Sequence, residues 1–151
     1  MQRSPQLAVL SREHHVALEI ALRLQRATDD NSRSVIAATF AFWETEGREH
    51  FTLEEELLLP ALAAHAGADD PDIRRVLTEH ADLCQRMSNL SSDPAPETIE
   101  LHELGQRLRN HVRYEERDLF GRVETTLSAD ELAALGDDLQ SAGTAHQPPR
   151  A

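Results

Sequence analysis

The chain has 151 residues, of which 40% are hydrophobic and 28% charged, the composition of a single globular domain. Its formal net charge of −12 repels phosphate groups, so we expect neither nucleic acid nor an anionic membrane surface as a partner. The single cysteine, Cys84, excludes an internal disulfide and a zinc site built from several cysteines. No apolar run reaches the roughly 18 residues that span a bilayer, and no signal-like stretch opens the chain, so we expect a cytoplasmic protein.

Two long segments with apolar residues at helical spacing occupy the first half of the chain. The first covers about residues 5–26 and is followed by a polar stretch, residues 28–34. The second covers about residues 35–64. Pro60 lies near its end and is expected to kink or weaken the last turns, because proline cannot donate a helical hydrogen bond.

The second half predicts two more long helices and a short one. The third helix starts at Pro71, directly after a capping aspartate, Asp70, and ends before a Pro-containing stretch at residues 91–96. The fourth covers about residues 97–126. The apolar stripes of these two helices place Leu77 and Ile99 inward. A short fifth helix is predicted to start at Ser128, which forms a capping-box pattern with Glu131.

No strand pattern competes with these helices, and their short connections favour antiparallel neighbours. The sequence therefore predicts an all-α protein, an up-down-up-down antiparallel four-helix bundle with a short C-terminal fifth helix. We expect one domain over residues 1–140 and a flexible tail over residues 141–151, which contain Pro and Gln.

Each of the four long helices carries a histidine on or beside its apolar stripe, and two of these histidines have a glutamate four residues later. A spacing of four residues puts both side chains on one helix face, about 6 Å apart along the axis. Imidazole together with carboxylate oxygen favours iron or manganese. The candidate metal ligands are therefore His14, His50, Glu54, His80, His111 and Glu115.

The positions of the four histidines along the chain indicate that they meet. In an antiparallel pair of helices, residues equally distant from the connecting loop lie at the same height. The midpoints between successive histidines fall at residue 32, at residue 65 and between residues 95 and 96. All three midpoints lie in predicted loops, so the four histidines should converge on one layer of the bundle.

The order His, His-x-x-x-Glu, His, His-x-x-x-Glu resembles the hemerythrin-like family, also called the HHE cation-binding domain. The resemblance covers about residues 7–125. A single His-x-x-x-Glu motif is weak, but two copies interleaved with two single histidines at matching heights are specific. The stretches that carry it are Ser11-Arg-Glu-His-His15, His50-Phe-Thr-Leu-Glu-Glu55, Glu79-His-Ala-Asp-Leu83 and His111-Val-Arg-Tyr-Glu-Glu116.

The resemblance implies a non-haem di-iron centre, two iron ions bridged by carboxylates and by an oxo or hydroxo group. By position, Glu54 and Glu115 would be the bridges and the four histidines terminal ligands. The chain departs from the oxygen-carrying hemerythrins at two places. It has Cys84 where they have a second third-helix histidine, and Glu116 where they have an aspartate.

These departures affect the expected function. Two six-coordinate irons need about twelve ligand positions, and the six residues with a bridging oxygen fill about ten of them. The open positions suit binding of, or reaction with, a small oxidant: O2, hydrogen peroxide or NO. Whether the protein is an enzyme of catalase type or only binds its ligand is left open. The alternative is an iron, redox or oxygen sensor that acts through a protein partner without turnover.

Several residues near the six candidates have two interpretations. His15 competes with His14 as the first ligand, although His14 continues the apolar stripe. Glu55 and Glu116 directly follow the two expected bridging glutamates. Each either takes the place of its neighbour as a metal ligand or contacts the ligands from outside the site. A recurring glutamate before the ligand histidines, as at Glu13, has no explanation from the sequence.

Four further residues are expected to play structural roles. Cys84 is interpreted as a small core residue and Trp43 as part of the core. Tyr114 is interpreted as a partly exposed helix residue, and His65 as a surface residue. The sequence leaves the oligomeric state open.

Overall fold

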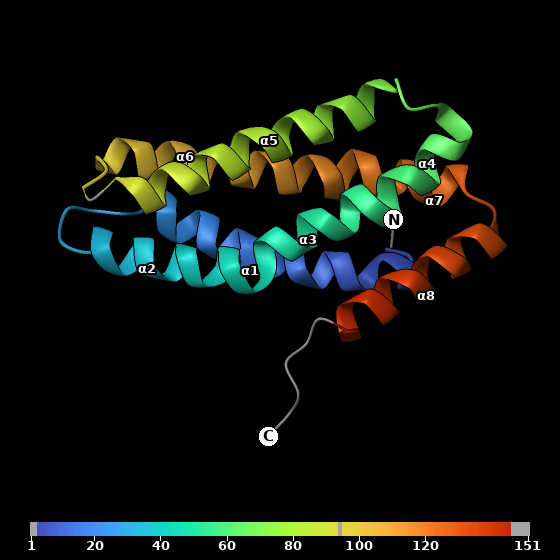
Figure 1. Ribbon diagram of the computed structural model, residues 1–151, viewed down its shortest axis with the longest axis horizontal. Helices are drawn as coiled ribbons and strands as arrows, with labels where there is room; N and C mark the ends of the chain where they lie inside the picture. The colour runs from blue at the N-terminus through green and yellow to red at the C-terminus, as the bar shows by residue number, and fades with distance from the viewer. Residues whose placement is uncertain (1–2, 94, 146–151) are drawn as a thin grey trace.

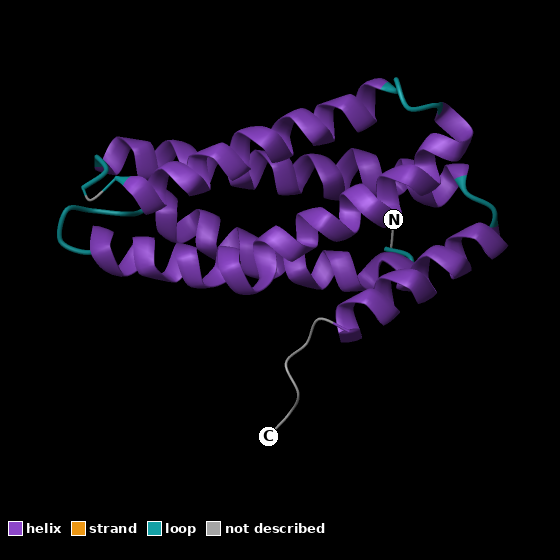
Figure 2. Cartoon of the chain, viewed as in Figure 1, coloured by secondary structure: helices purple, strands orange, loops and turns teal. Residues whose placement is uncertain are grey.

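The computed structural model describes residues 3–93 and 95–145 of the chain. Outside the short loops these residues are helical, and none of them forms a strand (Figure 2). This confirms the predicted all-α class. None of the helices in the described ranges has the length and apolar character needed to cross a membrane.

The helices follow the predicted segments closely. The bounds in the first half are η1, a 3-10 turn (Pro5–Leu7), α1 (Ala8–Gln25), α2 (Ser32–Phe42), η2 (Trp43–Gly47), α3 (Arg48–Leu53), η3 (Glu54–Leu58) and α4 (Leu59–Ala66). Those in the second half are α5 (Pro71–Ser92), α6 (Thr98–Tyr114), η4 (Glu115–Leu119), α7 (Phe120–Thr126) and α8 (Ala129–Ala145). The turns η2, η3 and η4 are π-helical and lie inside otherwise continuous helices.

The long helical segments lie side by side in Figure 1: α1, the run from α2 to α4, α5, and the run from α6 to α7. Helix α1 packs mainly on α6 and also on α2, while α5 packs on α6 and α2. Helix α8 packs at one end of the molecule against η1 and η3. This arrangement is compatible with the predicted four-helix bundle.

Two ends of helices confirm the predicted capping residues. Asp70 accepts hydrogen bonds from the backbone N–H groups of Asp72 and Ile73, with Pro71 at the first helical position. At α8, Ser128 Oγ accepts from the N–H of Glu131, and Glu131 accepts from the N–H of Ser128. The fifth helix is longer than predicted and continues to Ala145, while residues 146–151 of the predicted tail lie outside the described residues.

Pro60 does not end the second long helical run, which continues to Ala66. The turn before it is π-helical, with the N–H of Leu59 donating to the carbonyl of Glu54. The helix ends instead at Gly67, which has a φ of 87°. Only glycine adopts this left-handed conformation without strain.

The close contact between α1 and α6 depends on Gly105. A Cβ atom at this position would lie 2.6 Å from the carbonyl oxygen of Ala21 and 2.8 Å from Cβ of Leu24. Both distances are shorter than van der Waals contact, so any side chain here would push the two helices apart. The absence of a side chain therefore sets the spacing of the two helices that carry His14 and His111.

The buried apolar residues form two clusters, one on each side of the histidine layer. On α1, Leu10 belongs to one cluster and Ala17 to the other, with His14 between them. On α5, Val76 and Leu83 flank His80 in the same way. The polar layer thus crosses the core with apolar packing on both sides.

We expect Asp70→Ala to lower the free energy of unfolding by about 2 kcal/mol, about 1 kcal/mol from the helix cap and about 1 kcal/mol from charge-assisted bonds. Asp70 also accepts from Nη1 and Nη2 of Arg122, each at 2.6 Å. These hydrogen bonds to Arg122 hold the pKa of Asp70 below its ordinary value. The contribution is therefore full above about pH 4 and is lost as the pH falls through the lowered pKa.

Urea denaturation at pH 7 and at pH 3 measures this effect. Asp70→Asn, which keeps a capping acceptor but loses the charge, should lose less stability than Asp70→Ala. An unchanged urea midpoint in Asp70→Ala would show that the cap and the ion pair contribute nothing.

Candidate metal centre

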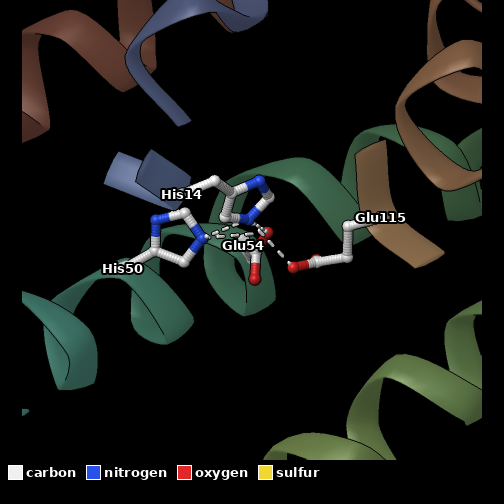
Figure 3. A group of neighbouring side chains, drawn as sticks. All are labelled: His14, His50, Glu54 and Glu115. Carbon is white, nitrogen blue, oxygen red and sulfur yellow. Dashed lines mark hydrogen bonds and ion pairs between the residues drawn. The ribbon is translucent and has the colours of Figure 1, made fainter. Parts of the chain in front are cut away.

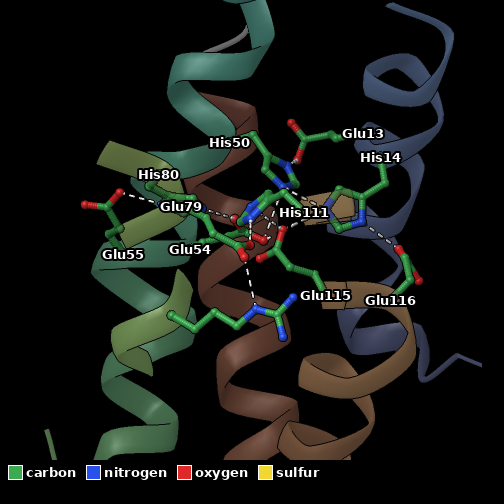
Figure 4. Close-up of polar contacts among 11 residues, drawn as sticks. Glu13, His14, His50, Glu54, Glu55, Glu79, His80, His111, Glu115 and Glu116 are labelled. Carbon is green, nitrogen blue, oxygen red and sulfur yellow. Dashed lines mark hydrogen bonds and ion pairs between the residues drawn. The ribbon is translucent and has the colours of Figure 1, made fainter. Parts of the chain in front are cut away.

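All six predicted ligand residues are buried, and their side chains converge between the helices (Figures 3 and 4). Glu54 and Glu115 are fully buried, at 0% exposure. Buried carboxylates are costly unless charged or hydrogen-bonding partners surround them. The histidines are His14 on α1, His50 on α3, His80 on α5 and His111 on α6.

His14, not its neighbour His15, joins the cluster, because His14 is 3% exposed whereas His15 lies on the solvent-exposed face of α1. The helical stripe thus predicts which of the two histidines faces the cluster. His65 is exposed, as predicted, and pairs with Glu131 of α8 at 2.8 Å.

Each of the two buried glutamates is the first residue of a π-helical turn. The N–H of Leu59 donates to the carbonyl of Glu54, and the N–H of Phe120 donates to the carbonyl of Glu115. A π turn contains one residue more than an α-helical turn, and such turns occur frequently at functional sites. The two glutamates therefore have the same local backbone as well as the same spacing from a histidine.

The six side chains form two overlapping groups of potential metal ligands. In each group one nitrogen or oxygen atom per residue lies within 4.8 Å of all the others. The first group, shown in Figure 3, contains His14 and His50. The second contains His80 and His111, and both groups contain Glu54 and Glu115.

All four histidines point Nε2 toward the buried glutamates. Nε2 of His14 lies 3.2 Å from Oε1 of Glu115, and Nε2 of His50 lies 3.2 Å from Oε2 of Glu54. In the second group, Nε2 of His80 lies 3.0 Å from Oε1 of Glu54, and Nε2 of His111 lies 3.0 Å from Oε1 of Glu115. Each glutamate therefore faces one histidine of either group.

Among the described residues, two buried carboxylate oxygens of this layer make no hydrogen bond: Oε2 of Glu115, and Oε2 of Glu54, which has only ion-pair contacts such as that with Nε2 of His50 at 3.2 Å. Buried polar atoms are almost always hydrogen-bonded, because leaving one unsatisfied costs about 1–3 kcal/mol. A cation between the carboxylates would satisfy both atoms. The donor set is thus compatible with metal binding.

The outward nitrogen, Nδ1, of each histidine contacts a further carboxylate (Figure 4). Such partners fix ring orientation and tautomer in metal sites. The pairs are His14 with Glu116 at 2.7 Å, His50 with Glu13 at 3.4 Å, His80 with Glu55 at 2.7 Å and His111 with Glu79 at 2.8 Å.

These contacts explain two glutamates that precede a ligand histidine. Glu13 contacts His50 rather than its neighbour His14, and Glu79 contacts His111 on the adjacent helix. The sequence shows the Glu-His pairs, but the partner lies on a different helix. Glu55 and Glu116 likewise contact histidines from outside the cluster, whereas Glu54 and Glu115 occupy its centre.

Two phenylalanines pack on the imidazole rings. Phe51 stacks on His80 with ring centroids 3.8 Å apart, and Phe120 stacks on His14 with centroids 5.2 Å apart. Together with the Nδ1 contacts, this packing restricts the rotation of both rings. The imidazoles are therefore oriented by the chain itself.

The acidic surroundings favour protonated histidines in the metal-free site. Burial alone would lower the pKa of His111, but Glu115 and Glu79 outweigh it and raise the pKa to about 10. Burial also opposes the charged form of His50, yet Glu54 and Glu13 raise its pKa well above the ordinary value. A metal ion must displace these protons before it can bind Nε2.

We therefore expect metal uptake at pH 7 to release at least about one proton per ion, and the apparent affinity to rise with pH up to about 10. The affinity rises with pH because the pKa values of the metal-free histidines are raised. These side chains keep their protons until the pH exceeds those pKa values. An indicator dye in weakly buffered solution measures the release during titration with Fe2+. His111→Ala should release fewer protons, and an affinity independent of pH would contradict the expectation.

Two expectations for neighbouring residues are wrong. Cys84 is exposed, because Leu83 and Met87 take the inward positions on α5. Tyr114 is buried, at 6% exposure, because Asp72 of α5 accepts its hydroxyl hydrogen bond and the guanidinium of Arg75 covers its ring at 3.7 Å. Trp43 is part of the core, as predicted.

A model of the family described as the hemerythrin HHE cation binding domain matches residues 6–123. The chain belongs to this family. Searches of curated proteins and of solved structures found no match. The range matched to the hemerythrin family contains all six clustered residues and the four glutamates that contact Nδ1 atoms.

In this hemerythrin-family chain we expect Glu55→Gln and Glu116→Gln each to weaken metal affinity about 10- to 100-fold. Each substitution removes the negative charge that holds one histidine, without altering the buried glutamates. Competition with a chromogenic chelator measures the affinity. Glu56→Gln, an exposed neighbour on the same turn, is the matched control and should bind like wild type. Equal affinities in all four proteins would contradict a role for the outer carboxylates.

Proposed function

We propose that the six buried residues bind two iron ions. His14 and His50 would be the terminal ligands of one ion, and His80 and His111 those of the other, with Glu54 and Glu115 bridging both. The observation that carries this proposal is the pair of overlapping groups that share both glutamates. Nitrogen and carboxylate donors without thiolates favour iron or manganese over metals that prefer sulfur.

A small cavity beside the cluster supports the proposal that the protein binds a small ligand. Its volume of about 20 Å3 is room for one molecule the size of water. Three of the clustered histidines and three glutamates lie on its wall, and the other lining residues, Leu108 and Val112 among them, are apolar. The small volume admits a molecule of a few atoms and no organic substrate.

We therefore propose a non-haem di-iron protein that binds or reacts with O2, hydrogen peroxide or NO. A bound pair of irons would supply electrons and open coordination positions for such a ligand. The chain itself holds the imidazoles by Nδ1 contacts and keeps bulk water away with apolar clusters on both sides. The buried carboxylates balance the positive charge of the metal ions.

Anaerobic iron-loaded protein titrated separately with O2, peroxide and NO tests the proposal. Spectral change with at least one of them is expected, and steady O2 release from peroxide would identify a catalase-type enzyme. One reaction per chain would instead indicate binding or stoichiometric reaction. His50→Ala, measured in parallel, should lose the response. No response of the iron-loaded wild type to any of the three ligands would overturn the proposal.

A further inference from the structure

Trp43 lines both the small cavity at the candidate metal centre and a groove on the surface. The cavity lies between α1, η2, α3 and α6, and Trp43 is part of its wall together with His50. The groove, about 280 Å3 in volume, lies between η2 and α5, and Trp43 lines it too. Cys84 and Arg48 are also on the wall of the groove.

The Trp43 ring contacts another aromatic ring and the guanidinium group of an exposed arginine. Phe51 meets the Trp43 ring edge-on with centroids 5.4 Å apart, and the guanidinium of Arg48 lies 5.9 Å from the ring. Gly47, one turn later, leaves space for the ring, because a Cβ atom there would lie 2.8 Å from Cε3 of Trp43. Both Trp43 and Gly47 belong to η2, the first of the three π turns in the described part of the chain.

A second way to the cavity would lead between Glu13 and Glu46, which line it on the side of α1. Glu13 contacts Nδ1 of His50 at 3.4 Å, so its displacement would release a candidate ligand ring. The ring and cation contacts of Trp43 are with Phe51 and Arg48, neither of which belongs to the ligand cluster or to the carboxylates that contact it. The side of Trp43 is therefore the less costly route for an uncharged or weakly polar molecule.

We propose that small ligands enter the metal centre from the groove beside Cys84, past a Trp43 side chain that swings aside. The inference rests on the proposed function, since it concerns access to the same site. Trp43 acts as a gate and not as a ligand. A gate changes the rates of ligand association and dissociation by the same factor, and it leaves the equilibrium affinity unaltered.

The groove beside Cys84 and the alternative entrance between Glu13 and Glu46 can be blocked separately. A bulky maleimide on Cys84 fills the groove, and Cys84→Ser treated with the same reagent is the control for side reactions. The variant Glu46→Cys in the Cys84→Ser background carries the same label at the other entrance. Anaerobic stopped-flow mixing of each iron-loaded protein with NO, an uncharged ligand, then gives association rates, and trapping of the released NO gives dissociation rates.

The label on Cys84 should slow the association and the dissociation of NO by about fivefold or more at unchanged affinity, while the label at position 46 should change neither rate. Trp43→Ala, which joins the cavity to the groove, should accelerate both rates. The opposite pattern, slowing only by the label at position 46, would overturn the proposal. Unchanged rates with the Cys84 label would overturn it as well.

A measurement on metal-free protein separates this inference from the proposed function. Trp43 is the only tryptophan of the chain, so its fluorescence reports on this position alone. The Cys84 label should lower the acrylamide quenching constant about twofold or more, and the label at position 46 should not. Unlabelled protein that takes up no iron would refute the metal centre, whereas equal quenching with and without the Cys84 label would refute the route.

Discussion

Replacement of Glu115 by alanine is expected to abolish the binding of both metal ions. Glu115 belongs to both ligand groups, is fully buried and faces one histidine of each group. Its loss would remove a proposed bridging carboxylate from both sites at once and take away the nearest carboxylate of Nε2 of His14 and of Nε2 of His111. His50→Ala, in contrast, removes a ligand of the first group only.

Elemental analysis of purified variants measures this difference. We expect about two metal ions per chain in wild type, about one in His50→Ala and close to none in Glu115→Ala. Asp118→Ala is the matched control, because Asp118 lies in the same π turn but is exposed. Full metal content in Glu115→Ala would show that this glutamate does not bridge the two ions. Full metal content in His50→Ala would show that this histidine is not a metal ligand.

The second large effect is on thermal stability. Without metal, the layer buries two carboxylates and four imidazoles, whose polar partners in the described part of the chain are one another and the outer glutamates. A ligand that binds only the folded chain at about 1,000 times its Kd adds roughly 4 kcal/mol. For a chain of this size that corresponds to an increase in Tm of roughly 8–16 °C.

Thermal unfolding followed by circular dichroism, with and without saturating Fe2+ under anaerobic conditions, measures the shift. Glu115→Ala should show almost no increase in Tm on addition of metal, although it folds to the same helical content. An equal increase in both proteins would mean that iron binds elsewhere on the acidic surface.

The sequence predicted the helices and the height of the site because both depend on regular spacing. The helical period places His14 and not His15 inward, and the midpoints of the histidine positions place all four in one layer. The caps at Asp70 and Ser128 were predictable because they need only neighbouring residues. The parts of the site that follow from one helix and its loops are thus visible in the sequence.

The outer carboxylates were not predictable in the same way. Glu13 and Glu79 precede ligand histidines in the sequence, but each contacts a histidine of another helix. Their roles depend on how neighbouring helices are rotated about their axes. The π turns at Glu54 and Glu115 also escape prediction, because one extra residue in a turn leaves no distinct mark in a pattern of apolar residues.

Exposure near the ends and edges of helices was the other source of error. Leu77 and Ile99 continue the apolar stripes of α5 and α6, yet they are 43% and 65% exposed. Ile99 lies in the first turn of α6, where a stripe can extend beyond the neighbours that would cover it. Tyr114 shows the reverse case, because a partner on α5 allows a hydroxyl group to be buried.

Diffraction from crystals of the iron-loaded protein, recorded at the iron absorption edge, tests the proposed centre most directly. We predict two anomalous peaks in each chain, one beside His14 and His50 and the other beside His80 and His111, with the carboxylates of Glu54 and Glu115 between them. A single peak, or iron peaks only at the acidic surface while the six buried side chains keep their present contacts, would contradict a di-iron centre in this protein.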